Sequence, residues 1–140
     1  MTAADQPSSR ESATEAGLVE EFDATGLYAL RAAVGAHATQ LGMGEEQLGK
    51  LLIIATELAT NAIRHGGGKG RLRLWREGGA LHCEVSDAGP GISDPDQVGT
   101  RPVPLNVDGG RGLWIVRQFA DKVAVTNRSP GTTIHATLHL

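Results

Sequence analysis

The spacing of hydrophobic residues changes along the chain and divides it into helices and strands. Between residues 25 and 41 apolar residues recur every three or four positions, which predicts a helix. The same spacing returns from about residue 45 to residue 65 and predicts a second helix, whose acidic first turn suits the positive end of the helix dipole. Glycines at positions 42, 44 and 66–68 indicate where these two helices stop.

The remaining pattern is that of strands, interrupted by one more helix. Alternating apolar and polar residues predict strands at 71–76 and 80–86, joined by the turn Glu77-Gly78-Gly79. A third helix is predicted at 112–120, strands follow at 123–126 and 132–138, and a weaker pattern at 18–22 indicates an edge strand. This order predicts an α+β fold, a two-layer α/β sandwich in which three helices cover one face of a mixed, mostly antiparallel sheet.

Two stretches of the chain show neither the spacing of a helix nor the alternation of a strand. Residues 1–16 contain almost no large apolar side chain, so we expect a disordered tail in front of a single domain at residues 17–140. Residues 92–108 contain three prolines and several turn formers, and a loop of this length inside a small domain is often functional. We therefore expect a lid over a binding site.

Composition and charge exclude several kinds of partner. The chain has 140 residues, of which 40% are hydrophobic, and its net charge is −3, so it has no basic surface for nucleic acid or an anionic membrane. It has a single cysteine, and its longest purely apolar run is far too short to cross a bilayer. These features predict a cytoplasmic protein that binds neither nucleic acid nor membrane.

The second helix carries the first candidate chemistry, on its polar arc. Glu57 and Asn61 are four residues apart and therefore share one face. The amide oxygen of Asn61 can bind Mg²⁺ together with phosphate oxygens, and the carboxylate of Glu57 can accept the proton of an attacking hydroxyl. The alternative is that the pair only forms a solvated helix face.

A glycine-rich turn, Asp87-Ala88-Gly89-Pro90-Gly91, follows a buried strand. The carboxylate of Asp87 can accept a hydrogen bond from the amino group of adenine, while Gly89 and Gly91 let the base lie against the backbone. Guanine presents an oxygen at that position, so this aspartate would select adenine. The alternative is an ordinary turn that begins with aspartate.

A second glycine-rich turn, Gly109-Gly110-Arg111-Gly112, opens the third helix. The start of a helix exposes backbone N–H groups that bind anions, and Arg111 adds a positive charge. The alternative is a flexible start to the helix. No Gly-Lys-Ser/Thr follows, so this is not a Walker loop.

Other residues of interest have structural explanations. Cys83 belongs to the buried face of its strand, and His65 lies in the last turn of the second helix, where a cation favours the dipole. The histidines lack the spacing of a zinc site. Trp114 falls on the arc opposite the apolar stripe of its helix, so we expect it to pack against the lid or a partner, or beneath the N-terminal tail.

Taken in order along residues 18 to 140, these motifs resemble the ATP-binding domain of the GHKL superfamily, shared by gyrase B, Hsp90, histidine kinases and MutL. The matching boxes are Glu57-x-x-x-Asn61-Ala62, Asp87-x-Gly89-x-Gly91 and Gly110-x-Gly112-Leu113. The closing Gly131-Thr132-Thr133 resembles the last nucleotide-side motif of the superfamily. The resemblance implies the Bergerat fold.

The chain also resembles one group within that superfamily, the bacterial anti-sigma factor serine/threonine kinases, in its shortness and its Gly-Arg-Gly-Leu sequence. These proteins bind a sigma factor and phosphorylate a serine of an anti-anti-sigma antagonist. The resemblance implies ATP and Mg²⁺ as cofactors, Glu57 as general base, Asn61 as the Mg²⁺ ligand and Asp87 as the adenine acceptor. The implied nucleotide-binding positions are Asn61, Asp87, Gly89, Gly91, Gly109, Gly110, Arg111, Gly112, Leu113, Thr132 and Thr133.

Two other members of the superfamily fit the sequence less well. A sensor histidine kinase would carry a phosphoacceptor helix and a phenylalanine-containing lid, and an ATP-gated clamp like gyrase B would carry a transducer domain. A module that binds ATP and a partner without catalysis shares every box, so the sequence leaves it open. It also leaves open a homodimer and the identity of the sigma factor and antagonist.

Overall fold

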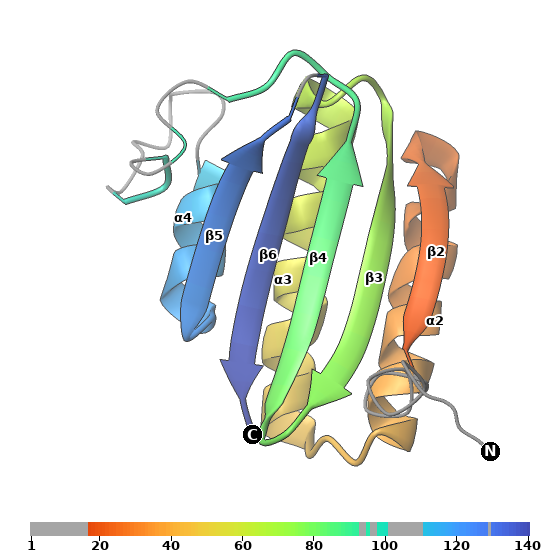
Figure 1. Cartoon of the computed structure of the whole chain (residues 1–140). Helices are drawn as coiled ribbons and strands as arrows, with labels where there is room; N and C mark the ends of the chain where they lie inside the picture. Colours follow the sequence, from red (N-terminus) through yellow and green to blue (C-terminus); the bar gives the residue numbers. More distant parts are fainter. Residues whose placement is uncertain (1–16, 93–94, 96–97, 101–110, 129) are drawn as a thin grey trace, which may run out of the picture.

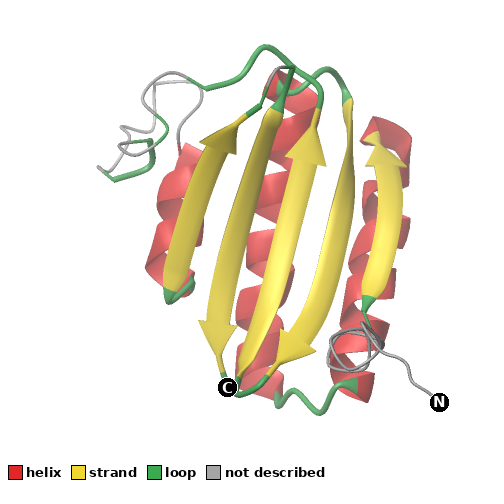
Figure 2. Cartoon of the chain, in the orientation of Figure 1, coloured by secondary structure: helices red, strands yellow, loops and turns green. Residues whose placement is uncertain are grey.

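The computed structural model describes residues 17–92, 95, 98–100, 111–128 and 130–140. Within them a five-stranded sheet carries three α-helices on one face (Figures 1 and 2). The strands are β2 (Leu18–Asp23), β3 (Lys69–Glu77), β4 (Ala80–Asp87), β5 (Lys122–Asn127) and β6 (Thr132–His139). The helices are α2 (Leu27–Gln40), α3 (Glu45–His65) and α4 (Arg111–Phe119), with a 3₁₀ turn, η1 (Ala24–Gly26), before α2. The order of elements is the predicted one.

The sheet is antiparallel throughout its described strands, in the order β2-β3-β4-β6-β5. The expectation of a mixed sheet is therefore wrong. The reason is visible in Figure 1, where β4 and β5 run in the same direction because α4 returns the chain to the lower edge of the sheet. The final hairpin then inserts β6 between them, and β6 is antiparallel to both.

The helix α3 is the centre of the helical layer. It lies behind the middle of the sheet and packs against α2 on one side and α4 on the other (Figure 1). Its inner face consists of residues that are at most 1% exposed: Leu51, Ile54, Ala55, Leu58, Ala59 and Ala62. This confirms the apolar face that the spacing of hydrophobic residues between 45 and 65 predicts. None of the helices in the described part of the chain is long and apolar enough to span a membrane.

Local chemistry explains where these elements begin and end. Asp23 accepts the backbone N–H of Thr25 at 3.0 Å and so caps a 3₁₀ turn, after which α2 begins at Leu27. The hairpin between β3 and β4 turns at Gly78, whose φ of 62° favours glycine. Both strands are longer than predicted, and Asp87 is the last residue of β4. Cys83 is buried as expected, and burial raises the pKa of its thiol to about 12.

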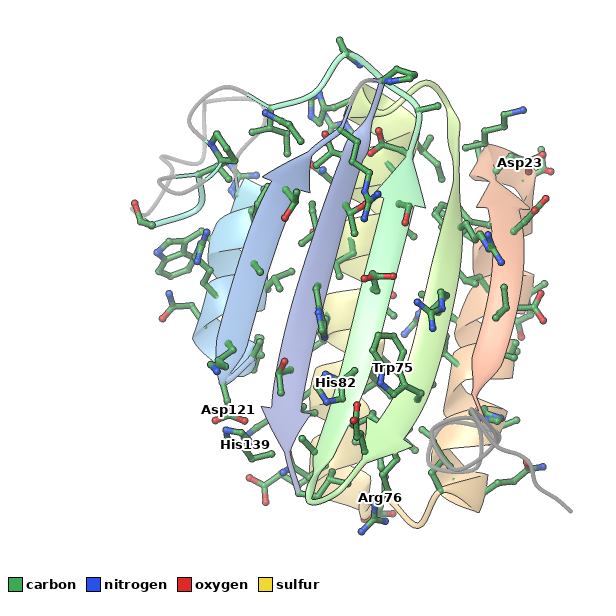
Figure 3. The ribbon with its side chains drawn as sticks, viewed as in Figure 1. Asp23, Trp75, Arg76, His82, Asp121 and His139 are labelled. Carbon is green, nitrogen blue, oxygen red and sulfur yellow. The ribbon has the colours of Figure 1, made fainter. Side chains whose placement is uncertain are left out.

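The other face of the sheet carries no helix of the described chain and bears polar and aromatic side chains. In its middle Trp75 stacks on His82, with ring centroids 5.1 Å apart (Figure 3). His82 Nδ1 and His135 Nε2 lie 2.8 Å apart, so one ring donates its N–H to the bare nitrogen of the other. Arg73 lies over Trp75, 4.7 Å from the ring centroid, and pairs with Glu84 at 3.3 Å. These contacts join β3, β4 and β6 on the side away from the helices.

The histidine pair predicts a pH-dependent stability. Burial, the charge of His135 and, more weakly, His139 hold the pKa of His82 below its ordinary value, against the opposing effect of Glu77. The unfolded chain therefore binds more protons than the folded one in acid, so the free energy of unfolding should fall as the pH drops below about 6.5. Urea unfolding at several pH values between about 7.5 and 5 measures this fall.

A variant isolates the contribution of this ring. His82→Gln should flatten the acid side of the profile, whereas His65→Gln, at an exposed position, should keep the slope of the original protein. Identical slopes for His82→Gln and the original protein would show that another group is responsible.

Candidate nucleotide site

Asp87 ends β4 with its carboxylate between two segments of the chain. Its Oδ1 accepts the backbone N–H of Gly89 at 2.9 Å, which closes the first glycine turn. Its Oδ2 lies against Gly66, the C-cap of α3, where a Cβ would overlap the carboxylate. Gly89 approaches Gly66 as closely, since a Cβ on Gly89 would come within 2.5 Å of the Gly66 Cα. The carboxylate therefore has a fixed place between the end of α3 and the turn.

The start of β6 forms the side of the site next to Asp87. Gly131 has a φ of 112° and lies so close to the Asp87 carbonyl that a Cβ would overlap it. Thr132 pairs with Asp87 in the register of β4 and β6. Successive side chains of a strand point to opposite faces, so Thr132 lies on the Asp87 face and Thr133 on the open face, where its Oγ1 accepts a hydrogen bond from Arg128 at 3.2 Å. Of the two threonines predicted beside the base, only Thr132 shares a face with Asp87.

The far end of the glycine turn is tied to β5 by Asn127. The side chain of Asn127 accepts the backbone N–H of Ile92 at 2.8 Å and donates to the Ile92 carbonyl at 2.7 Å. Gly91, with a φ of 94°, lies beside it, where a Cβ would be 3.2 Å from Asn127 Oδ1. Thr132 Oγ1 donates to that same oxygen at 3.3 Å. The turn is thus anchored at both ends.

Glu57 lies on α3 against the first turn of α4. A Cβ on Gly112 would come within 2.9 Å of Glu57 Oε1, so glycine is what allows this close approach of the two helices. Arg111, half-buried, is the first residue of α4. The Glu57 carboxylate therefore lies beside the end of a helix whose first backbone N–H groups have no partner within the helix. Tertiary packing brings together Glu57 on the polar arc of α3 and Gly112 in the first turn of α4.

The remaining predicted site residues have different surroundings. Asn61 is half-buried one turn further along α3 than Glu57, toward the Gly66 end. The side chain of Leu113 is 3% exposed and belongs to the hydrophobic core, so it can contribute to a ligand site only through its backbone.

Part of the predicted site lies outside the described residues. This holds for Gly109, Gly110 and most of the predicted lid. Near the end of the described lid residues, the Val98 carbonyl accepts a hydrogen bond from Arg117 Nε of α4 at 2.8 Å. Trp114 is half-buried, and neither the tail nor residues 101–110 are described, so its packing partner stays a prediction.

A cavity of about 560 Å³ opens beside Asp87, between the ends of β2, β3 and β4. Phe22 and Gly70 line it, whereas Glu57 and Asn61 do not. Of the predicted site residues, only Asp87 lines this cavity. None of the residues predicted to bind phosphate does. We define the candidate site by two approaches, that of Asp87 to Gly66 at the end of α3 and that of Glu57 to Gly112 at the start of α4.

Sequence reasoning missed two residues of this site. Gly66 was predicted only to stop a helix, yet it adjoins the Asp87 carboxylate. Asn127 belongs to no motif, and its role depends on its hydrogen bonds to the backbone of Ile92. For Gly66, the only indication in the sequence was its position directly after His65. Nothing in the sequence indicated that Asn127 belongs to the site.

The histidine kinase-like ATPase domain family matches residues 21–138. The chain belongs to this family. The three helices over an open antiparallel sheet are the fold of such domains, so the fold implied by the GHKL resemblance is confirmed.

Similar proteins agree with this membership. An anti-sigma F factor of Geobacillus kaustophilus (strain HTA426) is 30% identical over 120 residues, which cover 79% of this chain and 82% of the relative. The RsbU and RsbW domains of Rv1364c from Mycobacterium tuberculosis align with a TM-score of 0.66 at 15% identity, over 89% of this chain and 32% of that one. The SiaB-SiaC complex from Pseudomonas aeruginosa also gives 0.66, at 10% identity, over 94% and 95%. The two structures support the fold alone.

A histidine kinase-like ATPase domain needs a place for an adenine base and one for phosphates. Asp87 Oδ2 accepts no hydrogen bond from any residue that the structure describes, which leaves an acceptor for an amino group. The start of α4 suits phosphate oxygens, and the amide oxygen of Asn61 suits Mg²⁺. The residues present are therefore compatible with a magnesium–nucleotide complex.

Proposed function

We propose that this chain is an ATP-dependent serine/threonine kinase of the anti-sigma factor type, which phosphorylates an anti-anti-sigma antagonist and sequesters a sigma factor. The observation that carries the proposal is the contact of the Glu57 carboxylate with the first turn of α4. A proton acceptor beside a helix start that suits phosphate is the arrangement that phosphoryl transfer needs. The family match supports ATP, and the similarity to anti-sigma F factors supports the class of partner.

Each part of the site has a role in this proposal. Asp87 accepts the amino group of adenine, and the glycine turn after it lets the base approach the backbone. The start of α4, with Arg111 and Gly112, binds phosphate oxygens. Asn61 binds Mg²⁺ through its amide oxygen. Gly109 and Gly110 remain predicted members of the phosphate side.

The reaction itself is a transfer to a serine hydroxyl. When bound, Mg·ATP supplies the phosphoryl group and neutralises part of its charge. The serine oxygen forms a bond to the γ-phosphorus, the bond to the ADP oxygen breaks, and Glu57 accepts the hydroxyl proton.

Mixing the protein with γ-labelled ATP and each candidate antagonist tests the proposal. We expect label on a serine of one antagonist, located by mass spectrometry, and no transfer when EDTA removes Mg²⁺. A protein that binds ATP and a sigma factor but labels no antagonist would instead be the non-catalytic partner-binding module.

A further inference from the structure

The contact between Gly66 and Asp87 requires glycine for a reason other than backbone conformation. Gly66 has a φ of −111°, which any residue can adopt, unlike Gly131 with its φ of 112°. What excludes a side chain at position 66 is space, because a Cβ there would overlap the Asp87 carboxylate and would also lie 2.7 Å from the Ala62 carbonyl oxygen. The glycine at position 66 therefore leaves room for the side chain of Asp87.

The backbone of Gly66 cannot move away to make room. Its N–H donates to the Ala62 carbonyl at 2.8 Å as the last bond of α3. Gly89 also packs against Gly66, since a Cβ on Gly89 would meet the Gly66 Cα at 2.5 Å. A larger residue at position 66 would thus have to displace the Asp87 carboxylate.

The two oxygens of that carboxylate have different surroundings. Oδ1 is engaged by the N–H of Gly89 at 2.9 Å and belongs to the turn. Oδ2 lies on the Gly66 side and accepts no hydrogen bond from the described part of the chain. A new donor would therefore bind to Oδ2, and the space that Gly66 leaves determines where Oδ2 lies.

We propose that Gly66 is a positioning residue for adenine recognition: its bare Cα leaves room for Asp87 Oδ2, which is the oxygen that accepts the adenine amino hydrogen. This inference rests on the proposed binding of ATP and adds which oxygen and which neighbour select the base. Discrimination between ATP and ITP, which lacks the amino group, measures it directly. A charge-assisted hydrogen bond predicts that the original protein prefers ATP by roughly 10- to 100-fold.

The test is Gly66→Ala, with the dissociation constants of ATP and ITP measured by calorimetry in the presence of Mg²⁺. We expect the preference for ATP to fall to nearly one while the affinity for ITP stays unchanged. Gly49→Ala, a substitution on the same helix with no atom within 4 Å of the new Cβ, should keep the original preference. A merely structural role would weaken ATP and ITP equally, and that result, or an unchanged preference, overturns the proposal.

A second variant covers the case in which Gly66→Ala folds poorly. The double variant Gly66→Ala/Asp87→Ala removes the carboxylate that the new methyl group would meet, so its melting temperature should exceed that of Gly66→Ala. Absence of this rescue would also overturn the proposal, because the limiting contact of the new Cβ would then be the Ala62 carbonyl oxygen at 2.7 Å and not the Asp87 carboxylate. If the original protein binds neither nucleotide, the proposed function itself fails. Equal weakening of ATP and ITP, an unchanged preference or a missing rescue would each reject only the role of Gly66, because the original protein still binds ATP in all three cases.

Discussion

Glu57→Gln should lower phosphotransfer to the antagonist by roughly 100- to 10,000-fold while Mg·ATP still binds. Glutamine has the same shape, so the contact with Gly112 and the packing of α3 on α4 are kept. What it loses is the ability to accept the serine proton in the transition state. Initial rates with labelled ATP, together with the dissociation constant from calorimetry, separate these two effects.

Glu46→Gln is the matched control, because it removes the same charge from an exposed position at the start of the same helix. It should transfer phosphate at the original rate. If Glu57→Gln also transfers phosphate at that rate, Glu57 is not the general base and the proposed mechanism is wrong. If it neither binds nucleotide nor keeps its melting temperature, the carboxylate holds the two helices together instead.

Asp87→Asn should weaken ATP binding by roughly 10- to 100-fold, the second large effect. Asparagine can still accept the Gly89 N–H through its oxygen, so the turn keeps its closing hydrogen bond. Its NH₂ group then replaces Oδ2 and faces the adenine amino group, donor against donor. Calorimetry with Mg·ATP measures the loss, and thermal unfolding shows whether the turn is intact.

Asp121→Asn provides the comparison. The Asp121 carboxylate also accepts a backbone N–H, that of His139 at 2.6 Å, at the opposite end of the sheet (Figure 3). Its substitution should leave ATP affinity unchanged. Equal ATP affinities of Asp87→Asn and the original protein would remove the basis for adenine recognition by Asp87.

The elements of the fold could be predicted because their causes are local. The apolar stripe of α3 and the alternation in β4 depend on residues a few positions apart, and both are buried as expected. Strand ends were less predictable, since a ladder continues as long as the neighbouring strand offers partners. The sheet is antiparallel throughout its described strands because β6 inserts between β4 and β5, and no local pattern encodes that insertion.

The candidate chemistry divides in the same way. Residue types and spacing alone indicated Glu57, Asn61 and Asp87, because a carboxylate, an amide and glycine turns are what a magnesium nucleotide requires. That Thr132 shares the Asp87 face and Thr133 does not follows from strand register. Register is set by the pairing of β4 with β6, which only the folded chain fixes.

By itself, then, the sequence determined the elements, the central helix and the kinds of functional group available. Only the tertiary structure decided that the last turn of α3 meets Asp87 through Gly66, and that the first turn of α4 meets Glu57 through Gly112. The physical reason is one of range. Helix and strand periods act over a few residues, whereas these approaches depend on how two helices pack on one sheet, where a single Cβ would be too large.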